Sequence, residues 1–93
     1  MKILFEKKFL KDIEALRGNE LKQRIADVIR AVEHVATIHE VVNLKKMKGH
    51  KSAYRIRIGE YRLGCFIENH TFIFVRFLHR KDIYSYFPEY YCA

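Results

Sequence analysis

The sequence predicts an α+β domain in which a helical hairpin packs on one face of a small antiparallel sheet. Apolar residues recur at helical spacing in the first half of the chain, and in the second half they alternate with polar residues instead. We therefore expect the element order β-α-α-β-β-β, followed by a short C-terminal helix. With 93 residues, the chain has room for one domain, which we place at residues 1–93.

The first half of the chain is predicted to hold a short strand and both long helices. The strand covers residues 2–6, and the first helix covers residues 6–17 with its apolar side chains on one face. The second helix, at residues 20–37, has the longest periodic pattern in the chain, formed by Leu21, Ile25, Val28, Ile29, Val32 and Val35. Gly18 separates the two helices, so we expect an antiparallel pair that packs on the same face of the sheet.

The second half of the chain is predicted to form the rest of the sheet. Residues 42–47 form a strand or the approach to one. Residues 53–58 and 61–67 alternate apolar and polar side chains, which is typical of half-buried strands. Gly59 and Glu60 between them suit a two-residue turn, because glycine readily adopts a positive φ. We expect these two segments to pair as an antiparallel hairpin.

The chain is predicted to cross the sheet once more before it ends in a short helix. Residues 71–78 are apolar on both faces, so we expect this strand inside the sheet rather than at an edge. Residues 80–87 suit a short helix that Pro88 ends. The tail at residues 89–93 is expected to be loosely held.

The predicted hairpin gathers arginines on one face of the sheet. Arg55 and Arg57 alternate with apolar residues, so both point away from the apolar face. The two-residue turn sets Arg57 opposite Arg62, and like charges directly opposite on a sheet are destabilising. A chain that only had to fold would gain by avoiding this pair. We infer that an anionic group normally binds there.

The positive charge of the chain is concentrated in its second half. The net charge is +7, of which residues 43–93 carry +6 (ten Lys or Arg against four Asp or Glu) and residues 1–42 carry +1. This asymmetry indicates a polyanion or an acidic protein as the partner. For scattered lysines, a solvated basic surface explains the charge equally well, but it does not explain arginines that share one strand face.

The composition excludes several kinds of chemistry. The five histidines and two cysteines lack the spacing of a metal site, and we expect neither a metal nor a cofactor. No serine, carboxylate pair or glycine-rich loop has the context of a nucleophile, a glycosidase or a phosphate-binding motif. Cys65 is predicted to be a buried thiol and Cys92 an exposed one. No signal peptide or membrane span is visible, so we expect a cytoplasmic protein without a membrane partner.

Cationic and aromatic chemistry remains. Guanidinium groups bind phosphate oxygens in a bidentate manner, and the candidates are Arg55, Arg57, Arg62 and Arg80. Tyr84, Tyr86 and Phe87 can stack on nucleic-acid bases. His79 can transfer a proton near neutral pH. Two structural alternatives stay open, in which His79 only packs at the end of the strand and Tyr84 only closes the core.

Two motifs carry a family resemblance: Tyr54-Arg55-Ile56-Arg57-Ile58-Gly59-Glu60-Tyr61-Arg62-Leu63 and His79-Arg80-Lys81-Asp82-Ile83-Tyr84. With the helical hairpin before them, they resemble the RelE/ParE toxin superfamily of type II toxin–antitoxin systems over nearly the whole chain. The resemblance implies a bacterial or archaeal toxin with a cognate, usually acidic, antitoxin. Toxins of the RelE branch enter the ribosomal A site, among rRNA, and cut mRNA without a metal. The 2′-hydroxyl attacks the adjacent phosphate, which leaves a 2′,3′-cyclic phosphate and a 5′-hydroxyl.

The resemblance also implies roles for individual residues. Arg62 matches the arginine that braces the phosphate, and Arg80 matches the basic residue after the last strand. Tyr84 matches the tyrosine that stacks on the substrate or orients it. Either Lys45 or Lys46 falls near a further basic position of the family. Apart from this match, we expect RNA contacts from the lysines before the hairpin, which are Lys45, Lys46, Lys48 and Lys51.

The chain departs from the RelE pattern in its groups for proton transfer. Arg55 and Arg57 match positions that are lysine in the best-known RelE toxins. Arginine stabilises a negative phosphorane but does not readily give or take a proton. This leaves His79, alone or with Tyr84, as the candidate for proton transfer.

Three functions are compatible with this resemblance. We favour a ribosome-dependent mRNA endonuclease, because the arginine cluster is unfavourable for folding alone. The alternative is a ParE-like toxin that inhibits DNA gyrase by binding protein and is not an enzyme. The third is an inactive member that only binds an antitoxin.

Overall fold

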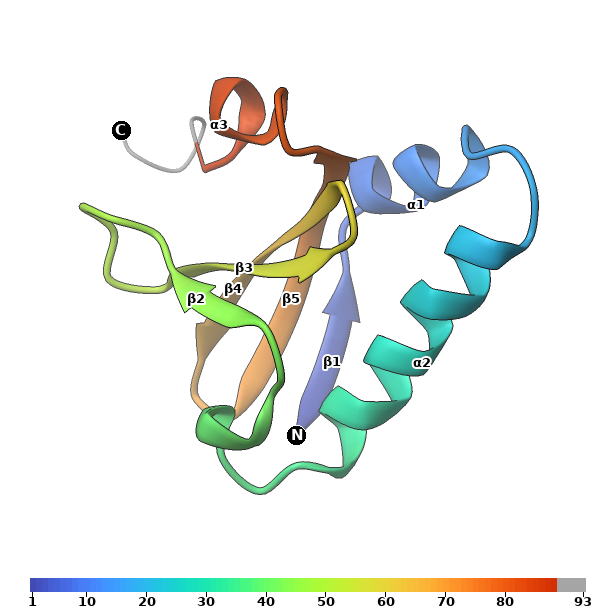
Figure 1. The fold of residues 1–93 in the computed structure, drawn as a ribbon. Coiled ribbons are helices and arrows are strands. Elements are labelled where there is room, and N and C mark those ends of the chain that lie inside the picture. The colour runs from blue at the N-terminus through green and yellow to red at the C-terminus, as the bar shows by residue number, and fades with distance from the viewer. Residues whose placement is uncertain (89–93) are drawn as a thin grey trace.

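The computed structural model describes residues 1–88 and contains a five-stranded sheet that two helices cover on one face (Figure 1). In chain order the elements are β1 (Lys2–Phe5), α1 (Lys7–Glu14), α2 (Glu20–His34), the 3₁₀ turn η1 (Ile38–Glu40), β2 (Leu44–Lys46), β3 (Ala53–Ile58), β4 (Tyr61–Glu68), β5 (Thr71–His79) and α3 (Ile83–Tyr86). The α+β fold class is confirmed. The expectations for Cys92 and for the tail at residues 89–93 lie outside the described residues.

The strands follow the order β1-β5-β4-β3-β2 across the sheet. Strands β2 to β5 pair antiparallel with one another, and β5 lies inside the sheet, as its apolar composition predicted. The expectation of a wholly antiparallel sheet is corrected at β1, which pairs parallel to β5 with Lys2 opposite Thr71. The helices carry the chain from β1 to the far edge of the sheet, and β2, β3 and β4 then bring it back to β5, which gives the parallel pair the long connection that it requires.

Both long helices are shorter than the sequence predicted, and the end of α2 shows the reason. α2 ends at His34, because Val35 already has an extended backbone with φ −80° and ψ 148°. The Glu40 carboxylate then accepts hydrogen bonds from the backbone N–H groups of Ala36 (3.0 Å) and Thr37 (2.9 Å). This capping box begins η1 and takes the last predicted residues away from α2.

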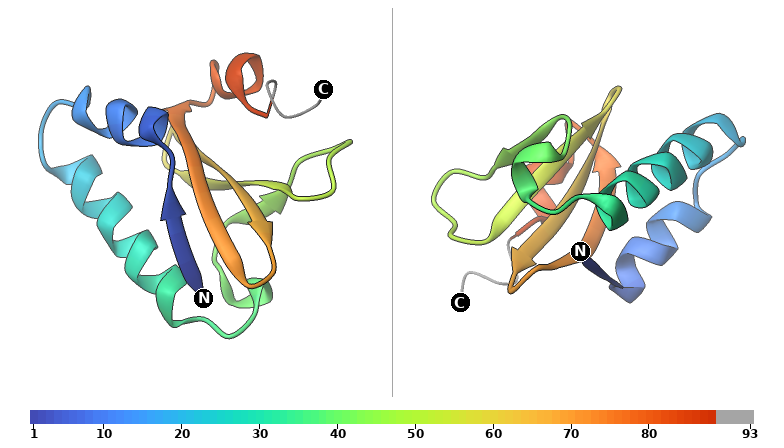
Figure 2. Two further views of the ribbon diagram at one scale, coloured as in Figure 1. Left: turned by 180° about the vertical axis from the view of Figure 1, so that it is seen from behind. Right: turned by 90° about the horizontal axis from the view of Figure 1, so that it is seen from below.

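The sheet has apolar side chains on both faces, so the protein has two cores. The larger core lies between the sheet and the helices and contains Phe9, Ile25, Val32, Ile56, Ile58, Leu63, Cys65, Phe72, Phe74 and Phe77. Figure 2 shows α1 and α2 together on this side of the sheet. The smaller core lies on the other face and contains Met47, Ala53, Val75, Ile83 and Phe87. The prediction of a buried thiol at Cys65 is confirmed, because this side chain lies inside the larger core.

The C-terminal helix α3 is shorter than predicted and closes the smaller core. Asp82 donates its backbone N–H to the carbonyl of His79 (2.8 Å), so residues 80–82 form a turn instead of helix. Phe87 is buried against Gly64, where an added Cβ atom would lie 2.6 Å from the Phe87 ring. The expectation that Phe87 stacks on a base is therefore corrected, because its ring is a core side chain. Gly64 gives α3 the room to approach the sheet.

Candidate functional site

The β3–β4 hairpin places three arginines on the face of the sheet opposite the long helices. Ile58 lies opposite Tyr61 and Arg57 opposite Arg62, as the two-residue turn predicted. Gly59 provides the positive φ of that turn, 59°. Because alternate residues of a strand point to opposite faces, Arg55 lies on the same face as Arg57 and Arg62. The predicted pair of facing like charges is confirmed.

These arginines line an open hollow with a volume of ≈ 400 Å³. Its lining is made by Asn43, Leu44, Lys45, Arg55, Arg57 and Arg62. Lys45 pairs with Arg55 across β2 and β3, whereas Lys46 pairs with Tyr54. Lys45 therefore faces the arginines and Lys46 faces the other way. We call the four residues Lys45, Arg55, Arg57 and Arg62 the cationic cluster.

Arg62 is tied to the hairpin turn and lies among like charges. Its Nη1 donates hydrogen bonds to the carbonyl oxygens of Gly59 (3.0 Å) and Tyr61 (2.9 Å). Burial is the largest cause of a lowered pKa at Arg62, and the positive charges of Arg55 and Arg57 are the next causes. An anion bound in the hollow would relieve this repulsion.

Tyr84 of α3 lies beside the cationic cluster. The guanidinium carbon of Arg55 is 5.8 Å from the centre of the Tyr84 ring, a cation–π contact. The Tyr84 side chain is 60% exposed, so the structure excludes the alternative in which it only closes the core. Tyr86 has a different partner, because the Arg76 guanidinium lies 5.4 Å from its ring centre.

His79 lies on the opposite face of the sheet from the arginines. Its ring packs edge-on against Tyr61, with the ring centres 5.5 Å apart, and Tyr61 stacks on Phe77 of the larger core. The backbone N–H of Lys81 donates a hydrogen bond to His79 Nδ1 (3.1 Å). The structure does not bring His79 to Arg62, and the alternative in which His79 packs at the end of the strand describes its surroundings.

A β-bulge explains why counting along β5 gives the wrong face for His79. Strict alternation from Phe74, which faces the helices, would put His79 on the arginine face. On β4, Cys65 pairs with Phe74, and the residue before Cys65 pairs with the residue after Val75. Val75 therefore has no partner on β4 and is the extra residue of the bulge. Phe77 therefore returns to the larger core, and His79 follows it.

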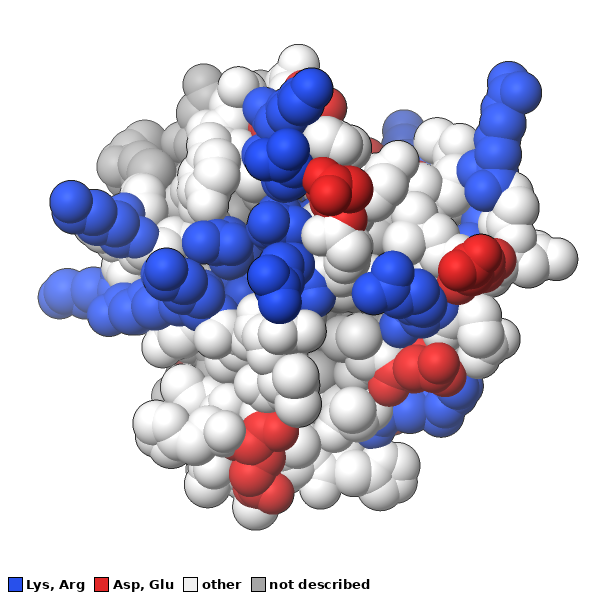
Figure 3. All heavy atoms as spheres, in the orientation of Figure 1, with Lys and Arg blue, Asp and Glu red and all other residues white. Residues whose placement is uncertain are grey.

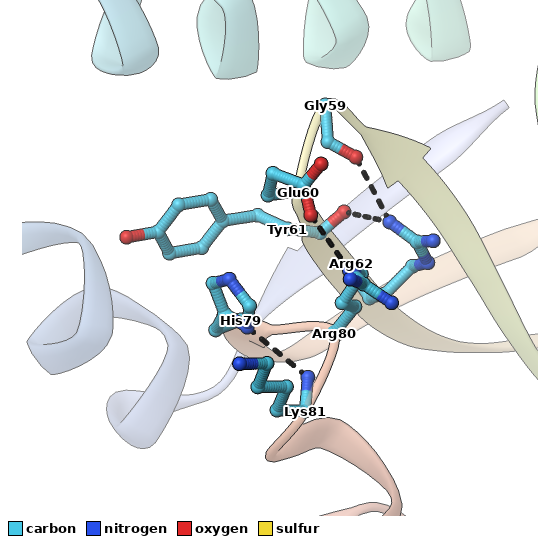
Figure 4. A network of polar contacts seen from close by, with 7 residues as sticks. All are labelled: Gly59, Glu60, Tyr61, Arg62, His79, Arg80 and Lys81. Atoms are coloured by element: carbon cyan, nitrogen blue, oxygen red, sulfur yellow. Dashed lines mark hydrogen bonds and ion pairs between the residues drawn. The ribbon is translucent and has the colours of Figure 1, made fainter.

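Arg80 is held at the hairpin turn by a residue that the sequence interpretation used only as a turn residue. Arg80 Nε donates a hydrogen bond to Glu60 Oε2 at 2.6 Å (Figure 4). The Arg80 guanidinium lowers the pKa of the Glu60 carboxyl, mainly through this hydrogen bond. The sequence carries one signal for this role of Glu60. It is an acidic residue in the turn between two strands that both carry arginines.

The predicted RNA-binding lysines divide between two places. Lys45 belongs to the cationic cluster, while Lys46, Lys48 and Lys51 line a separate hollow of ≈ 360 Å³ at the β2–β3 loop. Figure 3 shows Lys and Arg side chains gathered on the side of the molecule that carries β2, β3 and this loop. The loop therefore extends the positive surface beyond the cationic cluster.

The described part of the chain lacks two features that would suggest other functions. Residues 1–88 contain no group of three or more His, Cys, Asp or Glu side chains that could hold a metal ion. None of the helices within these residues is long and apolar enough to cross a membrane.

Known proteins resemble this chain in sequence and in fold. Residues 3–84 match the model of a family described as the ParE toxin of type II toxin-antitoxin system, parDE. The chain belongs to this family. It is also 42% identical to Toxin RelE3 of Methanocaldococcus jannaschii over 89 residues, which cover 95% of this chain and 100% of that toxin. The protein is therefore a type II toxin that resembles RelE.

Solved structures agree with this assignment. The chain resembles a chain of the RelB-RelE antitoxin-toxin complex from Methanococcus jannaschii with a TM-score of 0.76 and 40% identity, over 91% of this chain and 99% of that chain. It also shares its fold with a chain of the archaeal RelE-RelB complex from Pyrococcus horikoshii OT3, with a TM-score of 0.69 and 17% identity, over 88% and 97% of the two chains.

Proposed function

We propose that this toxin is a ribosome-dependent mRNA endonuclease that cuts RNA without a metal. One observation carries the proposal: the cationic cluster lines a single hollow, and it includes a pair of facing arginines that the fold alone would disfavour. Such a concentration of cations suits the phosphates of RNA. The likeness to Toxin RelE3 along the whole of that toxin supports the assignment to the RelE branch.

The proposed reaction is an attack of an RNA 2′-hydroxyl on the neighbouring phosphate. The 2′ oxygen bonds to phosphorus, the bond to the 5′ oxygen breaks, and a 2′,3′-cyclic phosphate remains. Arg57 and Arg62 would stabilise the negative charge of the phosphorane, because cations that are already in place stabilise developing charge. The 2′-hydroxyl has to lose a proton, and the 5′ oxygen has to gain one.

Lys45 is our candidate for the group that protonates the 5′ oxygen. It lines the same hollow as the arginines, and an ammonium group can give up a proton whereas a guanidinium cannot readily do so. His79 was the candidate from the sequence, but it packs on Tyr61 on the other face. In this scheme the proton of the 2′-hydroxyl passes to water.

Substitution of Lys45 tests this role. Lys45→Arg keeps the positive charge but removes the proton donor, so we expect a lower cutting rate at saturating ribosomes with affinity retained. Lys11→Arg is the matched control, because it makes the same change at an exposed residue of α1 that does not line the hollow. An unchanged rate for Lys45→Arg would remove Lys45 from the proton transfer.

Aromatic and basic groups around the hollow would hold the RNA. We assign to Tyr84 the stacking of a base next to the scissile phosphate, because its ring is exposed and lies beside Arg55. Arg80 would add a further cation near Arg62. The lysines that line the hollow at the β2–β3 loop, Lys46, Lys48 and Lys51, would contact rRNA phosphates at the A site.

The second proposed partner is a cognate acidic antitoxin. Two of the solved relatives are toxin–antitoxin complexes of RelB with RelE. A positive surface favours a partner rich in Asp and Glu, because complementary charges steer and orient the encounter. Both proposed partners place the toxin in the cytoplasm.

Primer extension on programmed, translating ribosomes tests the nuclease function. We expect new mRNA ends with a 5′-hydroxyl at A-site codons, and we expect Arg62→Ala to abolish them. Arg30→Ala is the matched control, because Arg30 pairs with Asp27 on the exposed surface of α2. Uncut mRNA beside an active control toxin would refute the nuclease function.

The family match favours one alternative target. Because residues 3–84 match the ParE toxin family, inhibition of DNA gyrase by binding is the second candidate function. In that case the arginines would bind an acidic protein surface. Intact mRNA together with DNA damage during growth arrest would identify this function.

A further inference from the structure

One turn holds two arginines, one from β4 and one from the turn that follows β5. In the β3–β4 turn, the carbonyls of Gly59 and Tyr61 accept hydrogen bonds from Arg62 Nη1. Between them, Glu60 binds Arg80 twice. Its carboxylate accepts from Arg80 Nε (2.6 Å), and its backbone carbonyl accepts from the Arg80 backbone N–H (2.8 Å). Figure 4 shows both guanidinium groups beside this turn.

Both guanidinium groups keep donors for a ligand. Arg80 uses Nε for Glu60, and within residues 1–88 its two Nη groups have no protein partner. Arg62 uses only Nη1 within the same residues. A guanidinium carries five N–H donors in a fixed planar fork, so fixing one edge orients the remaining donors.

The contact between Glu60 and Arg80 is poorly explained by stability. The two side chains are 68% and 53% exposed, and exposed ion pairs contribute little to folding. A carboxylate beside a surface that binds a polyanion also repels the ligand. Neither folding stability nor attraction of the ligand therefore explains an acidic residue at this turn.

We propose that Glu60 is a positioning residue that fixes the Arg80 guanidinium beside Arg62, so that both arginines bind the same substrate phosphate. The proposal rests on the proposed nuclease function. Glu60 itself does not touch the RNA. Its carboxylate orients Arg80 in advance, which removes the entropy cost of ordering this long side chain as the transition state forms.

The sign of the effect of Glu60→Gln separates positioning from simple charge repulsion. If Glu60 only repelled RNA, its neutralisation would improve cutting. If Glu60 positions Arg80, the loss of the charge-assisted hydrogen bond lowers kcat by about 10-fold, while KM does not rise. Glu68→Gln is the matched control, since it removes the same charge from an exposed residue at the other end of β4.

A double-mutant cycle with Arg80→Ala tests whether Glu60 acts through Arg80. We expect Glu60→Gln to lower kcat in the wild-type background and to have no further effect in Arg80→Ala. Full additivity of the two losses, or cutting by Glu60→Gln equal to or faster than wild type, would overturn the positioning role. Wild-type protein that leaves mRNA uncut would instead refute the nuclease function, so the two failures are distinct.

Discussion

Asp12 of α1 forms a two-point ion pair with Arg76 of β5. Asp12 Oδ2 accepts a hydrogen bond from Arg76 Nε (2.8 Å), and Oδ1 accepts one from Nη2 (3.2 Å). The same carboxylate also accepts the backbone N–H of Phe77 (2.9 Å). The side chains of Arg76 and Asp12 are only 15% and 14% exposed. This largely desolvated ion pair therefore fixes α1 to β5, an inner strand of the sheet.

Removal of this carboxylate should destabilise the protein. We expect Asp12→Ala to lower the free energy of unfolding by about 2–3 kcal/mol, because it removes the charge-assisted hydrogen bonds to Arg76 and the acceptor of the Phe77 N–H. Urea titration followed by circular dichroism measures this change. Asp27→Ala removes an exposed partner of Arg30 and should cost less than about 1 kcal/mol. Equal losses in the two variants would contradict the distinction.

Relief of the facing arginines should raise stability and lower toxicity together. Arg57→Thr removes one of two like charges and places a good strand former in β3, so we expect a gain of roughly 0.2–1 kcal/mol in the free energy of unfolding. Growth assays should show weaker toxicity. The gain should shrink at high salt, since salt screens exposed charges. A variant that is less stable and fully toxic would show that the pair serves the fold.

The space above Gly64 should control α3. A Cβ at Gly64 would lie 2.6 Å from the buried Phe87 ring, so we expect Gly64→Ala to cost roughly 1–3 kcal/mol and to displace α3. Displacement of α3 would move Tyr84 away from Arg55 and slow RNA cutting. Gly64→Ala combined with Phe87→Leu makes room again, and thermal unfolding should show partial recovery. An undiminished melting temperature for Gly64→Ala alone would show that α3 adapts without cost.

The capping box of η1 should make stability depend on pH. Hydrogen bonds from the backbone N–H groups of Thr37 and then Ala36 hold the pKa of Glu40 below its ordinary value of 4.5. A carboxyl with a lower pKa in the folded state stabilises the protein above that ordinary value, and this stabilisation is lost as the pH falls through the folded pKa. Glu40→Gln should therefore be less stable than wild type near neutral pH and should converge with it in acid. Urea titrations from neutral to acidic pH measure the difference in the free energy of unfolding between the two proteins. A difference that does not change with pH would show that the Glu40 carboxylate does not stabilise the capping box through its charge.

The sequence alone was sufficient to predict those parts of the structure that a local rule decides. The register of Arg57 with Arg62 follows from period-two alternation and a glycine in a two-residue turn, so it was predictable. The parallel pairing of β1 with β5 was not predictable, because no local sequence pattern specifies which strand of the sheet leaves an edge free for β1. The face of His79 depended on one unpaired residue in β5, and the contact of Glu60 with Arg80 depended on where β5 ends beside the turn.

The bulge at Val75 separates the length of β5 from the faces that its later residues occupy. A relative without Val75 would pair regularly and would still place Phe77 in the larger core and the histidine beside the tyrosine, because the partners of both residues on β4 stay the same. A relative that kept this residue but paired it regularly would instead turn Phe77 and the histidine to the arginine face, at the expense of a core side chain. The bulge therefore lets β5 gain or lose one residue here while the residues that meet the substrate keep their places.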